Sequence, residues 1–196
     1  SFQKNTQNRQ LKLCIQPMGW IGPKQTLKTK SRRELAEKRL SKLWARGCEF
    51  LGVKYAILGG AMTWVSDHKL VAAISNAGGF GILATGSMNK DQLQSEINLT
   101  FKMTSNPFGV NLITMHPDIS KLCDVCISSG VSHVVLAGGL PKISEINQLK
   151  SGGIKVLGFA PSIGFAKRLI RGGVDAIIIE GAEAGGHVGP VSTGVL

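Results

Sequence analysis

The segment Glu180–Gly189 holds the residue types best suited to chemistry in this sequence. It follows the apolar run Ala176–Ile179, and its carboxylates at Glu180 and Glu183 can accept hydrogen bonds. His187 can take up or release a proton near neutral pH. Further glycines expose backbone amides and keep the loop compliant: Gly181, Gly185 and Gly186. We therefore expect His187 to act as a general acid or base in this loop.

Two other candidate segments also follow apolar runs. Gly59 and Gly60 come directly after Leu58, and two glycines allow a flat ligand to approach the backbone closely. Met62 follows in the same turn. Asn111 lies near the end of a later apolar run, where its carboxamide can both donate and accept a hydrogen bond at the edge of a ring. A plain tight turn and a turn-capping asparagine are the alternatives that the residues leave open.

The remaining three histidines have positions typical of structural residues. His68 begins a predicted helix, His116 precedes Pro117 at the start of another helix, and His133 leads into a predicted strand.

Alternating apolar and amphipathic segments must position these loops. Six short runs rich in Val and Ile predict buried strands: Tyr55–Leu58, Gly81–Ala84, Phe108–Leu112, His133–Leu136, Lys155–Phe159 and Ala176–Ile179. Helical patterns lie between them: Asp67–Asn76, Lys90–Met103, Asp118–Ser129, Ser144–Lys150 and Ser162–Arg171. This alternation indicates a parallel β/α architecture.

The spacing of the strands predicts a TIM-type (β/α)8 barrel, in which active sites lie at the carboxyl ends of the strands. Successive strands begin about 24 residues apart, so residues 54–196 hold about six units. We therefore expect an N-terminal portion of the barrel that lacks its last two units. A complete doubly wound sheet, which needs only five or six strands, is the alternative.

The segment Gly79–Ala84 matches the dinucleotide-binding pattern GxGxxA. That motif must follow a strand and open a helix, whereas this segment follows a predicted helix and runs into a predicted strand. We expect no dinucleotide site here, and Gly78 with Gly79 to end the preceding helix.

The positive charge is concentrated at the N-terminus. Residues 1–53 hold 12 Lys and Arg against three acids, and residues 54–196 hold 11 against nine. We expect a basic, disordered leader over 1–33, a helix over 34–53 that is capped by Ser31 and Glu34, and a partial barrel over 54–196. The leader lacks the interleaved aromatic residues of a nucleic-acid surface, so no specific nucleic acid is expected. The sequence has no apolar run of membrane-spanning length.

The spacing of the cysteines predicts buried structural residues and no metal site. Cys123 and Cys126 form a CxxC within a predicted helix, but no second pair lies at zinc spacing, so we expect two buried thiols and no metal. Their use fits a reducing, cytoplasmic location.

Four segments resemble, in order and spacing, the nitronate monooxygenase family. They are Ile57–Met62, Asn76–Gly81, Pro107–Asn111 and Glu180–His187, and the resemblance covers about residues 50–196. The family implies an FMN-bound barrel. It implies flavin contacts at Gly59, Gly60, Met62, Asn111, Glu180, Gly185 and Gly186. It places His187 beside the reactive ring, facing the substrate.

The sequence departs from the family at several points. Many members have Gln where this chain has Glu180, which places a negative charge near the ring, and Val188 replaces an Arg found in some members. The family's phosphate-binding loops come from the last two units, which these 196 residues lack.

The resemblance implies FMN-dependent oxidation of alkyl nitronates by oxygen. A related activity, FMN-dependent reduction of enoyl-acyl carrier protein by NAD(P)H, shares the loop motif and is the first alternative. A non-catalytic flavin or anion binder with a basic arm is the second. The expected partners are a small-molecule substrate, a nitronate or an enoyl thioester, and oxygen. A homodimer is left open.

Overall fold

The computed structural model describes the backbone of residues 23–196 and the side chains from residue 31 onward. It divides into two units, residues 1–40 and 41–196. Helix α1 (Pro23–Leu51) runs through the boundary, and in the first unit the Arg33 guanidinium donates to the Glu37 carboxylate over 3.0 Å. None of the described helices combines the length and hydropathy that crossing a membrane requires.

The predicted start of α1 is wrong. The helix begins at Pro23, so Ser31 and Glu34 lie inside it and form no capping box. Proline suits a first helical turn because that turn has no use for its missing N–H, and the Lys, Gln and Leu residues that follow favour helix. Residue 33, where the leader was expected to end, lies within α1. The disorder expected of residues 1–22 lies outside the described residues.

The second unit contains one parallel sheet in the order β1-β2-β3-β4-β5-β6. Its strands are β1 (Leu58–Gly59), β2 (Phe80–Ala84), β3 (Phe108–Ile113), β4 (His133–Ala137), β5 (Lys155–Ala160) and β6 (Ala176–Ile179). Each strand pairs only with its neighbours in sequence, and β1 and β6 are the two edges. A doubly wound sheet would reverse its strand order at a switch point, so this order rules that alternative out.

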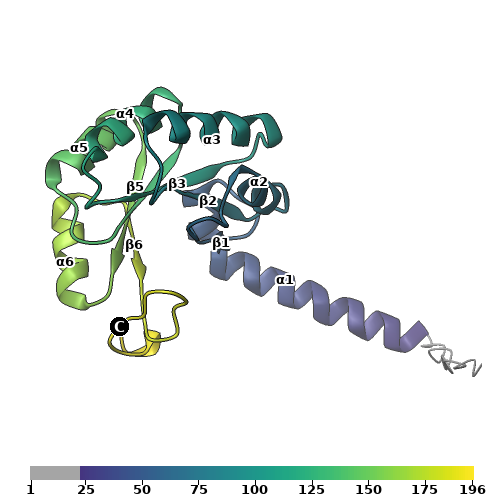
Figure 1. Ribbon diagram of the computed structural model, residues 1–196. Helices are drawn as coiled ribbons and strands as arrows, with labels where there is room; N and C mark the ends of the chain where they lie inside the picture. The colour runs from purple at the N-terminus through teal and green to yellow at the C-terminus, as the bar shows by residue number, and fades with distance from the viewer. Residues whose placement is uncertain (1–22) are drawn as a thin grey trace, which may run out of the picture. The chain divides into compact units, whose positions relative to one another are not determined.

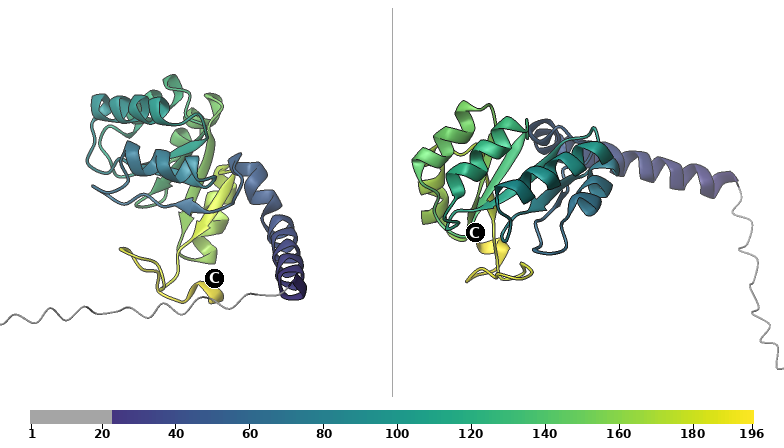
Figure 2. Two further views of the ribbon diagram at one scale, coloured as in Figure 1. Left: turned by 90° about the vertical axis from the view of Figure 1, so that its right-hand side faces the viewer. Right: turned by 45° about the horizontal axis from the view of Figure 1, so that its top comes forward.

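Helices α2 to α6 lie around the outside of the curved sheet (Figures 1 and 2). They are α2 (His68–Asn76), α3 (Lys90–Met103), α4 (Ile119–Ser128), α5 (Ile143–Ser151) and α6 (Ile163–Gly172), and a short 3₁₀ helix, η1 (Thr193–Val195), follows β6. The unit is thus a half-barrel with the predicted alternation of strand and helix. The bounds of α3 and β6 are those expected from the sequence, whereas β1 is shorter than predicted.

Apolar side chains fill both faces of the sheet. The outer cluster lies between strands and helices and includes Leu83, Val110, Leu112, Leu122 and Val134. The inner cluster includes Leu51, Phe80, Ile82, Val135 and Leu157. Because successive residues of a strand point to opposite faces, burial on both sides explains the uninterrupted apolar runs of the sequence.

Two sequence interpretations are confirmed by the order of the elements. β2 follows α2 and opens no helix, so Gly79–Ala84 is not a dinucleotide loop. Gly78, just past the end of α2, has φ +90°, a conformation that glycine adopts without strain.

Cys123 and Cys126 are buried on one face of α4, as expected. Burial raises the pKa of the Cys123 thiol to about 12 and raises the pKa of Cys126 as well, so both stay protonated. In the described part of the chain no group of His, Cys, Asp and Glu could hold a metal ion.

The last turn of α1 is fixed to the sheet through one carbonyl group. The Phe50 carbonyl oxygen lies 2.9 Å from His133 Nε2 and also accepts a hydrogen bond from the Lys155 ammonium. The Phe50 ring packs edge-on against the His133 ring, and Leu51 is buried in the inner cluster. His133 is therefore structural, as the sequence suggested.

Stability should fall on mild acidification because of His133. Burial lowers its pKa below the usual 6.5, an effect that the Phe50 carbonyl partly opposes. Below pH 6.5 the unfolded chain binds a proton that the folded protein excludes, so the free energy of unfolding should decrease as the pH falls from 6.5 towards the folded pKa. One group contributes at most about 1.4 kcal/mol per pH unit.

Urea unfolding at pH 7.5 and 5.5 measures this loss. The variant His133→Gln, whose amide can still donate to Phe50, should lose less stability between the two pH values than the parent. An unchanged pH dependence in His133→Gln would contradict the assignment.

Candidate functional site

The carboxyl ends of all strands in a parallel sheet lie on the same side of the sheet, and the candidate residues lie on that side. Gly60 and Met62 follow β1, Asn111 lies within β3, and the loop with Glu180 and His187 follows β6. In Figure 1 this last loop, in yellow, leaves the end of β6.

The turn after β1 is held by the buried hydroxyl of Ser66. This hydroxyl donates to the Gly60 carbonyl over 3.1 Å and accepts from the Met62 N–H over 3.0 Å. The Ser66 carbonyl accepts from the Ala84 N–H at the end of β2, over 3.1 Å. Ala84 is the sheet partner of Asn111, so the turn that contains Gly60 and Met62 lies next to Asn111.

Gly59 and Gly60 have different surroundings, so glycine serves a different purpose at each position. A Cβ at Gly59 would overlap the side chain of Ile74, so glycine there allows α2 to pack on β1. A Cβ at Gly60 would meet no atom within 4 Å. Gly60 thus leaves open backbone at the edge of the sheet, and the cofactor contact predicted for Gly59 stays a prediction.

Asn111 points into the interior of the half-barrel. Its neighbours Val110 and Leu112 belong to the outer cluster, so alternation turns Asn111 to the opposite face. The residue is only 8% exposed. Its carbonyl oxygen accepts from the Thr85 hydroxyl, but within the described residues its carboxamide makes no hydrogen bond. An unpaired amide in a nearly buried position is available to a ligand.

The loop after β6 is closed on itself. The Glu183 carboxylate accepts from both the N–H and the hydroxyl of Thr193, each over 2.8 Å, and the Gly189 N–H donates to the Gly181 carbonyl over 3.0 Å. The two Thr193 donors hold the pKa of Glu183 below its usual value. Glu183 is therefore the structural carboxylate of the loop, whereas the half-buried Glu180 makes no side-chain hydrogen bond to a described residue.

Gly185 and Gly186 lie at the open part of this loop. A Cβ at either position would meet no atom within 4 Å, and Gly186 has φ +82°, which favours glycine. His187 comes next and is exposed, with no hydrogen-bond partner among the residues that the structure describes. Because β1 and β6 are opposite edges of the sheet, the half-barrel brings Gly60, Met62 and Asn111 together but does not join them to the His187 loop.

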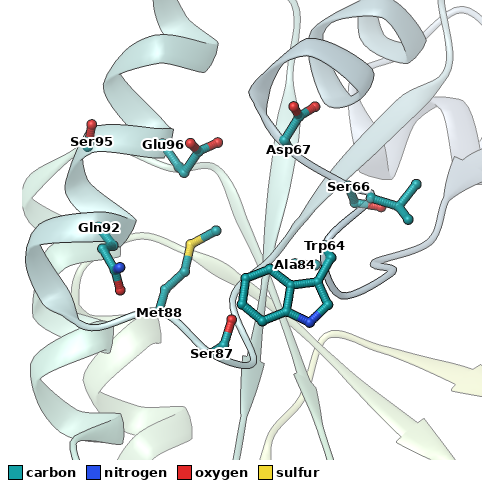
Figure 3. A pocket seen from close by; sticks show the side chains of 10 residues that line it. Trp64, Ser66, Asp67, Ala84, Ser87, Met88, Gln92, Ser95 and Glu96 are labelled. Carbon is teal, nitrogen blue, oxygen red and sulfur yellow. The ribbon is translucent and has the colours of Figure 1, made fainter.

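A pocket of about 330 Å³ beside this edge was not anticipated from the sequence. Figure 3 shows Gln92, Ser95 and Glu96 of α3 on one side and Trp64 and Ser66 on the other. The pocket also contacts Ala84 and Met88. The sequence feature that could have indicated this pocket is Trp64, an aromatic residue in the loop that follows β1.

Trp64 has an unusual backbone and an unusual exposure. It has φ +68°, the left-handed region, where a residue other than glycine costs about 1–2 kcal/mol. Its side chain is 87% exposed, so burial does not offset that cost. The conformation is set by the surrounding turn, in which the Met62 carbonyl accepts from the N–H groups of both Val65 and Ser66.

A hydrogen-bonded pair behind the pocket wall, between Glu96 and His68, was also missed from the sequence. The Glu96 carboxylate accepts from the His68 N–H over 3.0 Å and lies 2.9 Å from His68 Nδ1. This pair joins the start of α2 to α3, so His68 is structural, as predicted. His116 is structural too, because its Nδ1 accepts from the Asp118 N–H.

The two separate groups of residues, one after β1 and β3 and one after β6, each have features that suit a flat ring such as that of a flavin. Gly60, Gly185 and Gly186 leave space for a flat group, and the unpaired Asn111 amide can both donate to and accept from a ring edge. The chemistry of this donor set suits a flavin ring, and the identity of the flavin stays a prediction.

Comparisons with known proteins agree with this geometry. Residues 45–126 and 118–195 match the sequence profile of the family described as nitronate monooxygenase. Over 151 residues the chain is 40% identical to a hydroxy-methyl-oxo-octahydroindene-carboxyl-CoA dehydrogenase of Rhodococcus jostii, covering 76% of this chain and 42% of that protein. It is 31% identical to a "Probable nitronate monooxygenase" of Staphylococcus aureus, covering 72% and 50%.

Solved structures show the same half-barrel. FabK from Thermotoga maritima is 40% identical with a TM-score of 0.74, over 77% of this chain and 48% of that one. A nitroalkane oxidase from Streptomyces ansochromogenes is 27% identical with a TM-score of 0.67, over 73% and 50%. The chain spans about half the length of the curated relatives it matches. Its profile match, its identity with these relatives and its fold place the chain in the nitronate monooxygenase family.

Proposed function

We propose that this chain provides the flavin-ring site of an FMN-dependent oxidoreductase. The observation that carries the proposal is the nearly buried, unpaired carboxamide of Asn111 beside the open turn at Gly60 and Met62. Bound FMN would supply two-electron redox chemistry. Asn111 would hold the ring edge, Gly185 and Gly186 would let the ring approach the second loop, and Glu180 would face it from the end of β6.

His187 is the residue that we propose to move a proton. The resemblance implies a position on the substrate side of the ring, and the exposure of His187 at the open end of the loop supports access to a substrate. A neutral nitroalkane must lose its α-proton before oxidation, and an enoyl thioester must gain one at the same carbon during reduction. One histidine next to the α-carbon serves either reaction.

Two substrate classes compete for this site. The family resemblance predicts alkyl nitronates, oxidised by oxygen, as the first class. The 40% identity with a dehydrogenase of a coenzyme A thioester, against 31% with the named nitronate monooxygenase, favours an acyl thioester such as an enoyl thioester. Oxygen uptake with an alkyl nitronate, compared with NADH or NADPH consumption with a crotonyl thioester, decides between them. Turnover of neither would favour the non-catalytic flavin binder.

The cofactor proposal predicts a specific effect of Asn111. A version with all eight β/α units should release FMN and not FAD, as identified by chromatography, whereas residues 1–196, without the phosphate-binding loops, should hold FMN poorly. Asn111→Leu keeps the size of the side chain and removes its hydrogen bonds, so the Kd for FMN should rise between about twofold and about tenfold. The exposed Asn147→Leu is the matched control and should bind FMN like the parent. Equal affinity in all three proteins would contradict the role of Asn111.

The cytoplasmic location and the homodimer expected at the outset stay predictions.

A further inference from the structure

We propose that the pocket between α2 and α3 binds the neutral, amide-containing arm of a pantetheine thioester. This inference rests on the thioester form of the proposed function and names the subsite that would hold the substrate's carrier arm. It is carried by the conformation of Trp64, by the charge of the pocket wall and by its position beside the flavin site.

The folded protein itself gives no reason for a tryptophan at position 64. The backbone there has φ +68°, which glycine adopts most readily, and the indole is 87% exposed. Neither local conformation nor packing explains the side chain, and strained residues of this kind cluster at ligand-binding sites. A ligand that stacks on the indole explains it.

The pocket wall selects the chemistry of that ligand. The described residues that line the pocket include no Lys, Arg or His, and the ionisable ones are Asp67 and Glu96; the His68 ring lies behind Glu96 and is paired with it. A phosphate or carboxylate is therefore disfavoured. Asp67 is occupied as the N-cap of α2, and one Glu96 oxygen is held by His68. Met88 adds an apolar side chain to the wall.

Neutral hydrogen-bonding groups complete the wall. Ser87 and Ser95 provide hydroxyls that make no hydrogen bond within the described part of the chain. Gln92 uses its carbonyl oxygen for the N-cap of α3, which leaves its NH₂ group free to donate. Amides are the matching ligand groups, because each amide offers one donor and one acceptor. A pantetheine arm contains two amides and no charge.

The pocket adjoins the proposed flavin site. Ser66 belongs to the pocket wall, and its hydroxyl fixes Gly60 and Met62. Ala84 also belongs to the wall and is the sheet partner of Asn111. A thioester with its acyl group at the ring can therefore extend its arm past Ser66 and Ala84 into this pocket.

Binding of pantetheine alone tests the subsite without any turnover. Isothermal titration of the purified protein should show saturable binding of pantetheine and none of inorganic diphosphate. Trp64→Gly should raise the Kd by about tenfold or more while leaving the melting temperature unchanged or higher, since glycine suits φ +68°. Trp64→Phe keeps an aromatic face and should stay within about threefold of the parent. Absent binding, or equal binding by Trp64→Gly, would overturn the proposal.

A series of arm lengths separates this proposal from the proposed function. The crotonyl thioesters of coenzyme A, pantetheine and N-acetylcysteamine share one acyl group and have progressively shorter thiol arms. Trp64→Gly should raise KM for the first two by about tenfold and leave the shortest unchanged. Equal losses on all three would refute the subsite while thioester turnover upholds the function. Pantetheine binding through Trp64 without turnover of any thioester would refute the thioester form of the function and uphold the subsite.

Discussion

Replacing His187 with asparagine should slow every reaction that moves a proton at the substrate's α-carbon by about 10²–10⁴-fold, the usual contribution of a positioned acid or base. The affected substrates are neutral nitroalkanes, which must lose that proton, and enoyl thioesters, which must gain it. A preformed nitronate has already lost the proton, so its oxidation should keep most of its rate. Steady-state rates with a matched nitroalkane and nitronate measure the difference.

Flavin content is the control for this variant. His187 has no hydrogen bond to any described residue, so asparagine should leave the loop and the bound flavin unchanged. Val188→Ala, one position along and equally exposed, should retain both activities. Equal losses on nitroalkane and nitronate, or loss of flavin, would show that His187 shapes the loop and is not the acid or base.

Gly189→Ala should raise the Kd for FMN by about 10- to 100-fold. A Cβ at this position would overlap the Glu180 carbonyl oxygen and would approach the Gly181 carbonyl carbon to 3.0 Å. These are backbone atoms that no side-chain rotation can move, so the loop must open. Overpacking of this kind typically costs about 1–3 kcal/mol, which corresponds to the predicted loss when binding needs the closed loop. Fluorescence titration with FMN measures it.

Two other alanine substitutions separate loop closure from ring contact. Gly194→Ala adds a methyl group where no atom lies within 4 Å, so it should change neither stability nor FMN affinity. Gly185→Ala also meets no protein atom, yet it would place its methyl group where we propose that the ring lies. It should weaken FMN binding without lowering the melting temperature. FMN affinity equal to the parent in Gly189→Ala would contradict the role of the closed loop.

The repeating architecture could be predicted because buried parallel strands and amphipathic helices have distinct periodicities. The runs at Lys90–Met103 and Ala176–Ile179 gave the bounds of α3 and β6 without error. The start of α1 could not be found in this way. Its first turns hold good helix formers but no apolar stripe or acidic cap, so the absence of acids suggested disorder.

The candidate site was predictable in type but not in detail. Glycines at strand ends signalled close approach, yet only the structure shows that Gly59 makes room for Ile74 and that Gly60 is open. Glu180 and Glu183 are indistinguishable in sequence, and the partnership of Glu183 with Thr193 depends on a loop that folds back ten residues later. The positive φ of Trp64 could not be predicted, because tryptophan has no preference for that backbone conformation.

The sequential strand order has a consequence for how the chain acquires its structure. Each strand finds its partner about one β/α unit away, so the sheet can grow one strand at a time, by the local contacts that favour fast folding. The clamp on the Phe50 carbonyl is different, because it spans 83 residues to His133 and 105 to Lys155. During synthesis this clamp can therefore close only after β5 has left the ribosome, and until then the inner cluster around Leu51 lacks Leu157 and leaves apolar surface that favours aggregation.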